Sequence, residues 1–517
     1  MAPAGEATSS MRIWGNARGD ALRMMISIAA SSAFLLFGYD QGVFAGLIGG
    51  NAFKETFPAS TKTLGTIVAI YEVGCFFGAV LTFFVGEKLG RRWSIVVGLI
   101  IMLVGTVLQA TAYGIPHMIV GRIVTGIGNG MNTSTVPMYQ AETSKAHSRG
   151  RMVSIEGWFI TVGIVISYWV TYGTAGVPDG AIQFRLPIVL QALFAIITLI
   201  LIFGLPESPR WLMNCGREVE AREVIALLEG VPIESEECER QFNDIKVSLS
   251  AESQGGPIQF KEYFRGGEQQ TFRRLLLAYG IQMMQQLTGI NAVIFYSAYL
   301  LQNTLGLDRE LSLIVGGCTG LCFFVFTFIP IIFIDKWGRR KPLIYGAAFQ
   351  AVCMCMIGVL IGVGGKSAGT AAIIFVFLYI ASYSGFGWVA CPWLYPTEIV
   401  ELRFRSKGTA LATMSNWSWN FMVVEITPIG AETLGYKFFF IFMVFNACFV
   451  PLIYFFYPET AGKSLEELDL LFVTDREGAF AGRFGNQQGS GRSSDDFDMK
   501  NMGVERIEAG EKSSSVV

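Results

Sequence analysis

Long apolar runs alternate with short polar connections along almost the whole chain. A helix rises about 1.5 Å per residue and a bilayer core needs about 20 residues, so twelve of the runs are long enough to span a membrane. These runs lie near residues 24–47, 64–85, 94–112, 116–136, 153–172, 186–205, 275–301, 311–334, 343–363, 371–394, 408–429 and 438–457. The pattern predicts an all-α integral membrane protein with twelve transmembrane helices.

One run, 275–301, carries five side chains that lipid would not tolerate: Gln282, Gln285, Gln286, Thr288 and Asn291. An amide that faces hydrocarbon leaves donors and acceptors unpaired at several kcal/mol each. The three glutamines share one helix face, and Gly289 weakens the helix so that Asn291 turns inward. These groups are predicted to face a cavity for a polar, hydrogen-bonding solute. Amide bonding between packed helices is the alternative.

Basic residues and a repeat indicate the topology. Lysine and arginine gather after the second, fourth, eighth and tenth runs, which predicts that these connections, the middle loop and both termini are cytoplasmic. The segment EKLGRR at 87–92 returns as DKWGRR at 335–340. Two parallel six-helix halves are therefore expected, as in carriers that rock about a central site.

The expected domains follow from this repeat. They are an N-terminal segment 1–23, a first bundle 24–205, a helical linker 206–272, a second bundle 273–457 and a tail 458–517 that is disordered beyond about residue 475. The linker carries an apolar stripe at 219–228, which predicts short amphipathic cytoplasmic helices beneath the two halves.

Acids and arginines recur at matched places in the two halves. We expect them to bridge cytoplasmic helix ends and hold the inner gate closed. They are Glu87, Arg91, Glu142 and Arg149 in the first half, and Asp335, Arg339, Glu398 and Arg405 in the second.

Composition excludes several other classes of protein. Only 15% of residues are charged and 52% are hydrophobic, and the two histidines do not supply a histidine-rich metal centre. The nine cysteines show no zinc or disulfide spacing, so free thiols are expected. No motif combines a nucleophile, a base and an orienting group, so we expect neither an enzyme nor a cofactor, and no nucleic-acid partner.

Seven motifs together resemble the sugar porter family of the major facilitator superfamily, and its fungal monosaccharide transporters most. They are GYDQG at 38–42, GR at 121–122, PMYQAE at 137–142, PESPR at 206–210, QQLTGIN at 285–291, GRR at 338–340 and PETAGK at 458–463. The resemblance covers nearly the whole chain apart from its tails. It implies a carrier that works by alternating access.

The resemblance also implies roles for individual residues. Gln285, Gln286 and Asn291 match positions that hydrogen-bond sugar hydroxyls, and an indole suits the C–H face of a sugar. Further matching positions are Trp393, Asn416 with Trp417, the aromatic Phe37 and the gating Tyr296. Ile164 and Phe323 stand where many members have Gln and Asn, which makes a smaller or less hydroxylated polyol a rival substrate.

Asp40 lies deep in the first run, where an unpaired charge costs about 2.5 to 3.5 kcal/mol. Arg122 in the fourth run is its natural partner. In the family, an aspartate at the position of Asp40 resembles the proton site of symporters. Protonation of that aspartate releases the partner arginine. A permanent structural ion pair in a passive carrier is the alternative.

The sequence thus predicts import of a monosaccharide, a hexose such as glucose or the pentose xylose, across the plasma membrane with proton symport. A facilitative uniporter, a polyol or glycerol–proton symporter and a non-transporting sugar sensor remain alternatives. The expected partners are sugar, proton and lipid bilayer, and the monomer is expected to be the functional unit.

Overall fold

The computed structural model describes residues 17–145, 149–178, 180–253, 262, 270–305, 308–401, 404–462, 468 and 472. Within these residues every regular element is helical. Nine described helical stretches are long and apolar enough to cross a membrane, and one of them, Lys407–Phe456, contains two successive helices. The predicted all-α membrane fold is confirmed.

The N-terminal half contains six long helices, and each coincides with a predicted run. They are α1 (Asp20–Leu47), α3 (Thr61–Leu89), α4 (Arg91–Ala110), α5 (Ile115–Thr143), α6 (Arg149–Ala175) and α7 (Ile182–Phe203), with a short α2 (Asn51–Thr56) between the first two. Several helices extend beyond the apolar run, because polar residues continue the helix outside the lipid.

The C-terminal half repeats this arrangement with two interrupted spans. Its helices are α11 (Thr271–Leu287), α12 (Ile290–Leu305), α13 (Arg309–Trp337), α14 (Arg340–Val363), α15 (Lys366–Gly385), α16 (Cys391–Ile399), α17 (Arg405–Leu434) and α18 (Phe438–Phe456). The break between α11 and α12 falls at Gly289, whose φ of 93° suits glycine and few other residues. The predicted weakening of the helix at this glycine is confirmed.

The predicted run over 371–394 is interrupted in the structure. That stretch divides into α15 and α16, because Gly387 adopts a φ of 78° and Pro392 stands at the start of the new helix. The apolar composition hid the break, since both pieces are hydrophobic.

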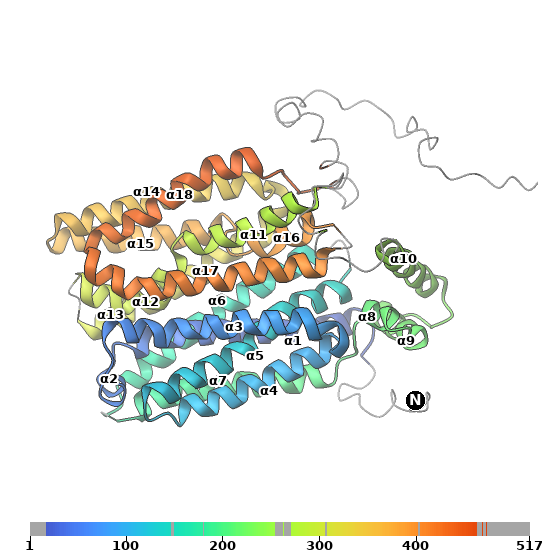
Figure 1. The fold of residues 1–517 in the computed structure, drawn as a ribbon, viewed down its shortest axis with the longest axis horizontal. Coiled ribbons are helices and arrows are strands. Elements are labelled where there is room, and N and C mark those ends of the chain that lie inside the picture. The colour runs from blue at the N-terminus through green and yellow to red at the C-terminus, as the bar shows by residue number, and fades with distance from the viewer. Residues whose placement is uncertain are drawn as a thin grey trace, which may run out of the picture.

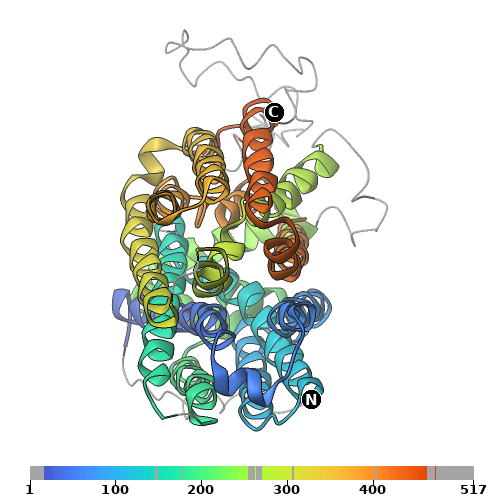
Figure 2. The ribbon, with the colours of Figure 1, turned by 90° about the vertical axis from the view of Figure 1, so that its left-hand side faces the viewer.

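The two halves meet along a seam made mainly by three helix pairs: α3 with α17, α6 with α13, and α1 with α12. Figure 1 shows the N-terminal half below the C-terminal half with the long axes of the helices roughly parallel, and Figure 2 shows the same two groups end-on. Across the seam the Trp158 indole stacks on Phe324 at 4.9 Å between ring centroids.

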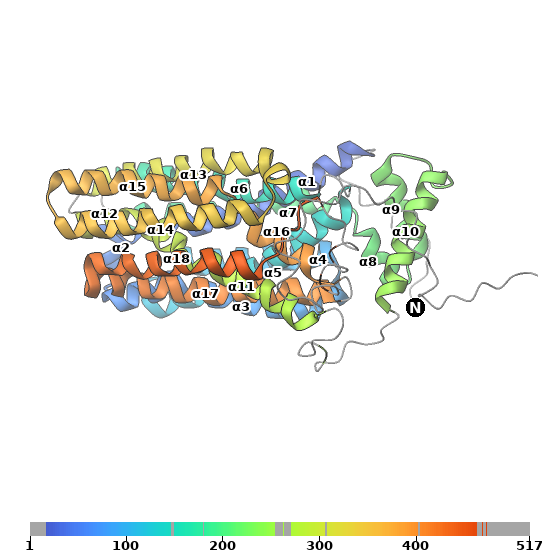
Figure 3. The same cartoon turned by 90° about the horizontal axis from the view of Figure 1, so that it is seen from above.

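The linker forms α8 (Pro209–Asn214), α9 (Glu218–Glu229) and α10 (Glu236–Ser253) beyond one end of the bundle (Figure 3). Helix α9 packs on the start of α1, where the Gly19 N–H donates to the Leu227 carbonyl over 2.7 Å. Helix α8 packs on α5. The predicted amphipathic helices are therefore present, but α8 and α9 lie under the N-terminal half rather than under both. Val219 of the predicted stripe is exposed.

Most of the tail lies outside the described residues, including the segment beyond 475 for which we expect disorder. Two of its residues, Leu468 and Phe472, are buried. The Arg274 guanidinium lies 4.3 Å from the centre of the Phe472 ring, so this part of the tail packs against the start of α11.

Glycines let α5 approach two neighbouring helices closely. A Cβ on Gly126 or Gly130 would lie 2.2 Å from the Tyr71 carbonyl oxygen or 2.0 Å from that of Cys75, both on α3. One on Gly128 would lie 2.3 Å from the Gly98 carbonyl oxygen on α4. The GxGxG pattern at 126–130 is therefore a helix-packing device and not a nucleotide-binding loop.

Gly130→Ala should destabilise the bundle, because the added methyl group meets backbone atoms that cannot rotate away. Overpacking of this kind costs about 1–3 kcal/mol. We expect a lower yield of monodisperse protein in detergent and a lower melting temperature. Gly173→Ala on α6 is the matched control, since its Cβ would meet nothing within 4 Å. Equal behaviour of the two variants would contradict this account of α5.

Candidate functional site

Buried amides gather where α11 breaks and faces α17. Gln282, Gln285 and Gln286 on α11, Asn291 on α12, and Asn416 and Asn420 on α17 are each at most 5% exposed. Five of them were singled out from the sequence, and Asn420 was not. We call these six residues the amide cluster. All six belong to the C-terminal half.

The amide cluster forms two hydrogen-bonded groups. Asn416 Nδ2 donates to the Oε1 atoms of Gln282 and Gln285 over 2.6 and 2.8 Å. Asn291 Nδ2 donates to Gln286 Oε1 over 2.6 Å and to Asn420 Oδ1 over 2.7 Å. In this conformation the amides therefore bond to one another, as the helix-packing alternative describes, and do not line an open chamber.

Aromatic side chains adjoin the cluster at the seam. The rings of Phe37 on α1 and Trp417 on α17 meet edge-to-face at 5.4 Å between centroids. Trp417 is fully buried, and its Nε1 has no hydrogen-bond partner among the described residues. The Tyr296 hydroxyl donates to the Val424 carbonyl over 3.1 Å, which ties α12 to α17. These contacts bring three of the predicted aromatic residues to the seam between α1, α12 and α17.

The fourth predicted aromatic residue, Trp393, lies in a different place. It is half-buried on α16 and lines a small pocket at the seam with Phe34, Glu156, Ile160 and Val389. No member of the amide cluster lines this pocket. The pocket nevertheless adjoins the cluster, because Gln285 Nε2 donates to the carbonyl of Val389, which lines the pocket with Trp393.

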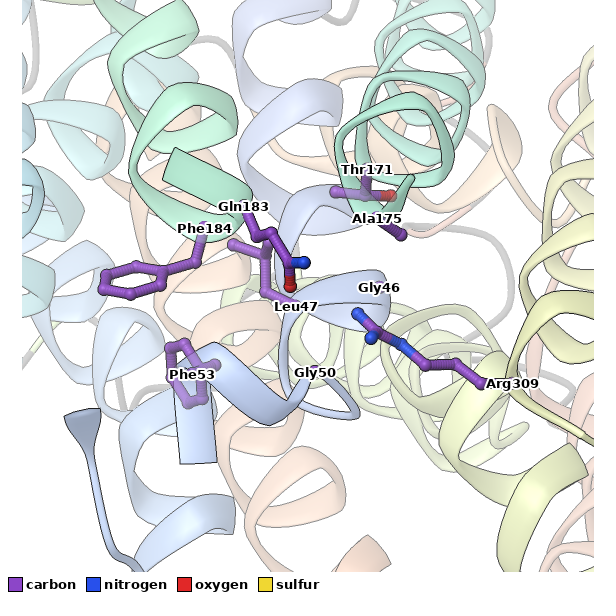
Figure 4. A pocket seen from close by; sticks show the side chains of 9 residues that line it. All are labelled: Gly46, Leu47, Gly50, Phe53, Thr171, Ala175, Gln183, Phe184 and Arg309. Carbon is purple, nitrogen blue, oxygen red and sulfur yellow. The ribbon is translucent and has the colours of Figure 1, made fainter. Parts of the chain in front are cut away.

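A second small pocket lies at the end of the bundle that carries α2. Figure 4 shows Arg309 of α13 reaching toward the end of α1 at Gly46, with Gln183 and Phe184 of α7 nearby. This pocket is also formed at the seam, because α13 belongs to the C-terminal half.

The predicted charge pair is confirmed. Arg122 Nη1 donates to Asp40 Oδ1 over 3.3 Å, and neither side chain has any exposed surface. Gln191 Nε2 donates to the same Asp40 oxygen over 2.8 Å. The Arg122 guanidinium also donates to the Val68 carbonyl over 2.8 Å and lies 4.1 Å from the centre of the Phe44 ring. The buried charges of Asp40 and Arg122 are therefore stabilised by several groups of the N-terminal half.

At the end near α8, an acid–arginine bridge forms within each half. Arg91 makes a two-pronged bond to Glu142 over 2.8 and 2.9 Å, and Arg339 Nη2 donates to Glu398 over 2.9 Å. Ser208 donates to Glu142, and Thr460 donates to Glu398. The predicted bridging of helix ends is thus observed for these four residues, although each bridge stays inside one half and does not cross the seam.

A second acid in each half caps the neighbouring backbone. Glu207 accepts from the Arg91 N–H over 2.9 Å, and Glu459 accepts from the Arg339 N–H over 2.8 Å. Burial raises the pKa of the Glu207 carboxyl above its ordinary value, while the N–H groups that it accepts act in the opposite direction. The matching networks support the internal repeat inferred from the sequence.

The other four residues of the predicted gate contribute differently. Glu87 is exposed, and its backbone carbonyl accepts from Trp211 Nε1 over 2.7 Å. The side chains of Arg149 and Asp335 lie outside the part of the chain that the structure describes. Arg405 is half-buried at the start of α17.

Loss of Glu398 should favour the conformation that is open at this end. Glu398→Ala removes the carboxylate that Arg339 bonds, and a hydrogen bond to a charged group is worth about 1.5–3 kcal/mol. In the variant, the Arg339 guanidinium lacks its carboxylate partner in the closed form, whereas opening would let water hydrate it. The ratio of open to closed forms should therefore rise about tenfold or more. Faster labelling of a Val389→Cys thiol in a background without native cysteines would show this. Glu432→Ala, at an exposed site on α17, serves as control.

Two buried acids escaped the sequence analysis. Glu72 on α3 and Glu156 on α6 are at most 1% exposed, and none of their carboxylate oxygens has a hydrogen-bond partner among the described residues. Each is a lone acidic residue within an apolar run, which is a sequence signal for a functional ionisable group in the membrane. Gln191, which bonds Asp40, was missed because a single glutamine in an apolar run is common.

Two six-helix halves with buried polar groups at their seam define a multi-pass membrane carrier. Residues 25–472 match the family model described as sugar (and other) transporter. The chain therefore belongs to the sugar (and other) transporter family of the major facilitator superfamily.

Individual relatives agree with this assignment. The MFS-type transporter oryC of Aspergillus oryzae is 40% identical over 462 residues, which cover 87% of this chain and 85% of the relative. The sugar transporter STL1 of Saccharomyces cerevisiae is 37% identical over 474 residues, covering 89% and 83%. The chain is also similar to the proton:xylose symporter XylE bound to 6-bromo-6-deoxy-D-glucose, with a TM-score of 0.75, 26% identity, and coverage of 88% and 100%.

Proposed function

We propose that this carrier imports a monosaccharide, a hexose such as glucose or the pentose xylose, across the plasma membrane by alternating access with proton symport. The amide cluster supports this proposal most directly. It places six side chains that donate and accept hydrogen bonds beside the seam, and vicinal hydroxyls need this combination. A solute would replace amide–amide bonds with amide–hydroxyl bonds.

The division of roles between the halves supports symport. The amides lie in the C-terminal half, and the Asp40–Arg122 pair lies in the N-terminal half. A proton on Asp40 would weaken its bond to Arg122 and leave the guanidinium to its other acceptors. Protonation would then change the packing of α1 against α5, and α1 contacts α12 across the seam.

A polyol such as glycerol is the second candidate substrate. Ile164 and Phe323 are buried apolar residues at positions where the resemblance expects hydrogen-bonding amides. Fewer polar groups suit a solute with fewer hydroxyls. The relative STL1 is named a sugar transporter, and the symporter XylE is named for xylose, so the comparisons favour a sugar.

Uptake by purified protein in liposomes tests the proposal. Radiolabelled glucose should enter, and competition with xylose, galactose, fructose and glycerol should rank the substrates. Uptake against a gradient that requires an inward proton gradient distinguishes symport from facilitated diffusion. Binding of sugar without uptake would indicate a sensor and would overturn the proposal.

A further inference from the structure

Of the described residues that line the small pocket beside Trp393, only Glu156 of α6 is charged. Its side chain is 1% exposed, and neither carboxylate oxygen has a hydrogen-bond partner within the described part of the chain. A buried carboxyl group without partners is costly, and an ionisable residue inside the membrane is a candidate functional group. The hydrogen-bond donors for Glu156 are therefore expected to come from a bound molecule.

This pocket, which we call the inner pocket, lies between the amide cluster and the bridged end of the bundle. On one side, Gln285 Nε2 donates to the carbonyl of Val389, a lining residue, over 3.4 Å. On the other side, Trp393 lies about one and a half helical turns before Glu398, whose bridge to Arg339 joins helix ends near α8. A solute that leaves the amide cluster toward this end would pass the inner pocket.

Both halves of the protein line the inner pocket. Phe34, Glu156 and Ile160 belong to α1 and α6 of the N-terminal half, whereas Val389 and Trp393 belong to the C-terminal half. Helices α6 and α16 contact each other directly. The pocket is small in this conformation. Alternating access separates the halves at one end at a time, so the pocket would widen when the bundle opens near α8.

The lining of the inner pocket suits a solute with several hydroxyl groups. An ionised carboxylate only accepts hydrogen bonds, and its two oxygens can accept from two neighbouring hydroxyls. Such charge-assisted bonds are roughly twice as strong as bonds between neutral groups. Trp393 and Phe34 supply apolar surface for the C–H groups of the same solute.

An organic ammonium ion would also suit a carboxylate beside an indole ring. The neighbouring amide cluster favours hydroxyls instead, because its side chains both donate and accept. A hydroxyl group uses both functions, whereas an ammonium ion only donates. One solute class therefore fits the amide cluster and the inner pocket together.

We propose that Glu156 and Trp393 form a second solute subsite, in which the Glu156 carboxylate accepts hydrogen bonds from adjacent hydroxyls of a sugar or polyol. This inference rests on the proposed function and adds a binding position between the amide cluster and the end near α8. Glu156 is then a specificity-determining residue, because it selects solutes that carry two free neighbouring hydroxyls.

Protection of a Val389→Cys thiol, in a background without native cysteines, tests this subsite. Glucose should slow labelling of the thiol in purified protein, because Val389 lines the inner pocket. Glu156→Gln replaces a charged acceptor by a neutral one, so the glucose concentration that gives half protection should rise about tenfold. Glu55→Gln, at an exposed site on α2, should leave this concentration unchanged.

Monodeoxyglucoses distinguish a contact with the solute from a structural role of Glu156. With Glu156 present, loss of either of two adjacent hydroxyls should raise the half-protection concentration about tenfold. In Glu156→Gln the same two analogues should differ from glucose by about threefold or less, because the partner of these hydroxyls has changed. An equal loss for every analogue in both proteins would show that Glu156 only supports helix packing and would overturn the subsite.

A second variant covers a folding failure of the first. Glu156→Asp keeps the charge but withdraws it by one methylene group, so the sensitivity to the same two hydroxyls should also be lost. Stronger protection by 2-amino-2-deoxyglucose than by glucose, with Glu156 present, would identify an ammonium site and overturn the hydroxyl subsite. Absence of uptake of every tested solute by the wild type would instead overturn the proposed function.

Discussion

Asp40→Asn should abolish accumulation of the solute while exchange of labelled for unlabelled solute continues. One proton moved across the membrane contributes about 2.3 kcal/mol per 100 mV, which supports accumulation of about 50-fold. Asparagine cannot take up or release the proton, so the variant should only equilibrate its substrate. Accumulation in vesicles and alkalinisation of the medium on addition of sugar measure this directly.

The matched control is Asp20→Asn on the same helix. Asp20 is 84% exposed and bonds Arg23 and Lys145 at the surface, where an ion pair contributes little. This variant should accumulate solute as the wild type does. If Asp40→Asn also accumulates solute normally, the buried pair is structural and the carrier takes its proton elsewhere.

Asn291→Ala should strongly weaken solute binding. Asn291 Nδ2 donates to both Gln286 and Asn420, so its loss leaves two buried acceptors without a donor and removes a donor for the solute. Buried unsatisfied groups cost about 1–3 kcal/mol each. We expect kcat/KM to fall about 10- to 100-fold, mainly through KM.

Asn129→Ala separates this effect from a general loss of stability. Asn129 is equally buried, but it lies on α5 and contacts Cys75 Sγ at 3.5 Å, away from the amide cluster. Its removal should lower the melting temperature without changing KM. An unchanged KM in Asn291→Ala would show that the cluster only joins helices.

The order of the long membrane helices was accessible from the sequence, because apolar length reports directly on membrane crossing. The Asp40–Arg122 pair was also accessible, since a buried charge requires a partner. All nine cysteines are free, as their spacing indicated. The break at Gly387 was missed, although Gly387 and Pro392 within this run gave a signal of the same kind as Gly289.

Pairing between distant polar groups was the least predictable feature. Each candidate amide was identified by residue type, but nothing in the chain indicated that Asn416 and Asn291 would bond other amides in this conformation. The position of Trp393 on α16 depends on the divided span, which was itself missed. Helix packing therefore decides which of several possible partners a buried side chain meets.

The mutual bonding of the amides has a consequence for the unloaded carrier. A transport cycle includes a conformational change of the carrier without bound solute. During this change, unpaired binding groups would be buried in the protein interior without water. Because four amide–amide hydrogen bonds form within the cluster, the unloaded conformation avoids most of the desolvation penalty of buried unpaired amides. On the proposed function, the amides that bind the solute therefore also lower the cost of the step in which it is absent.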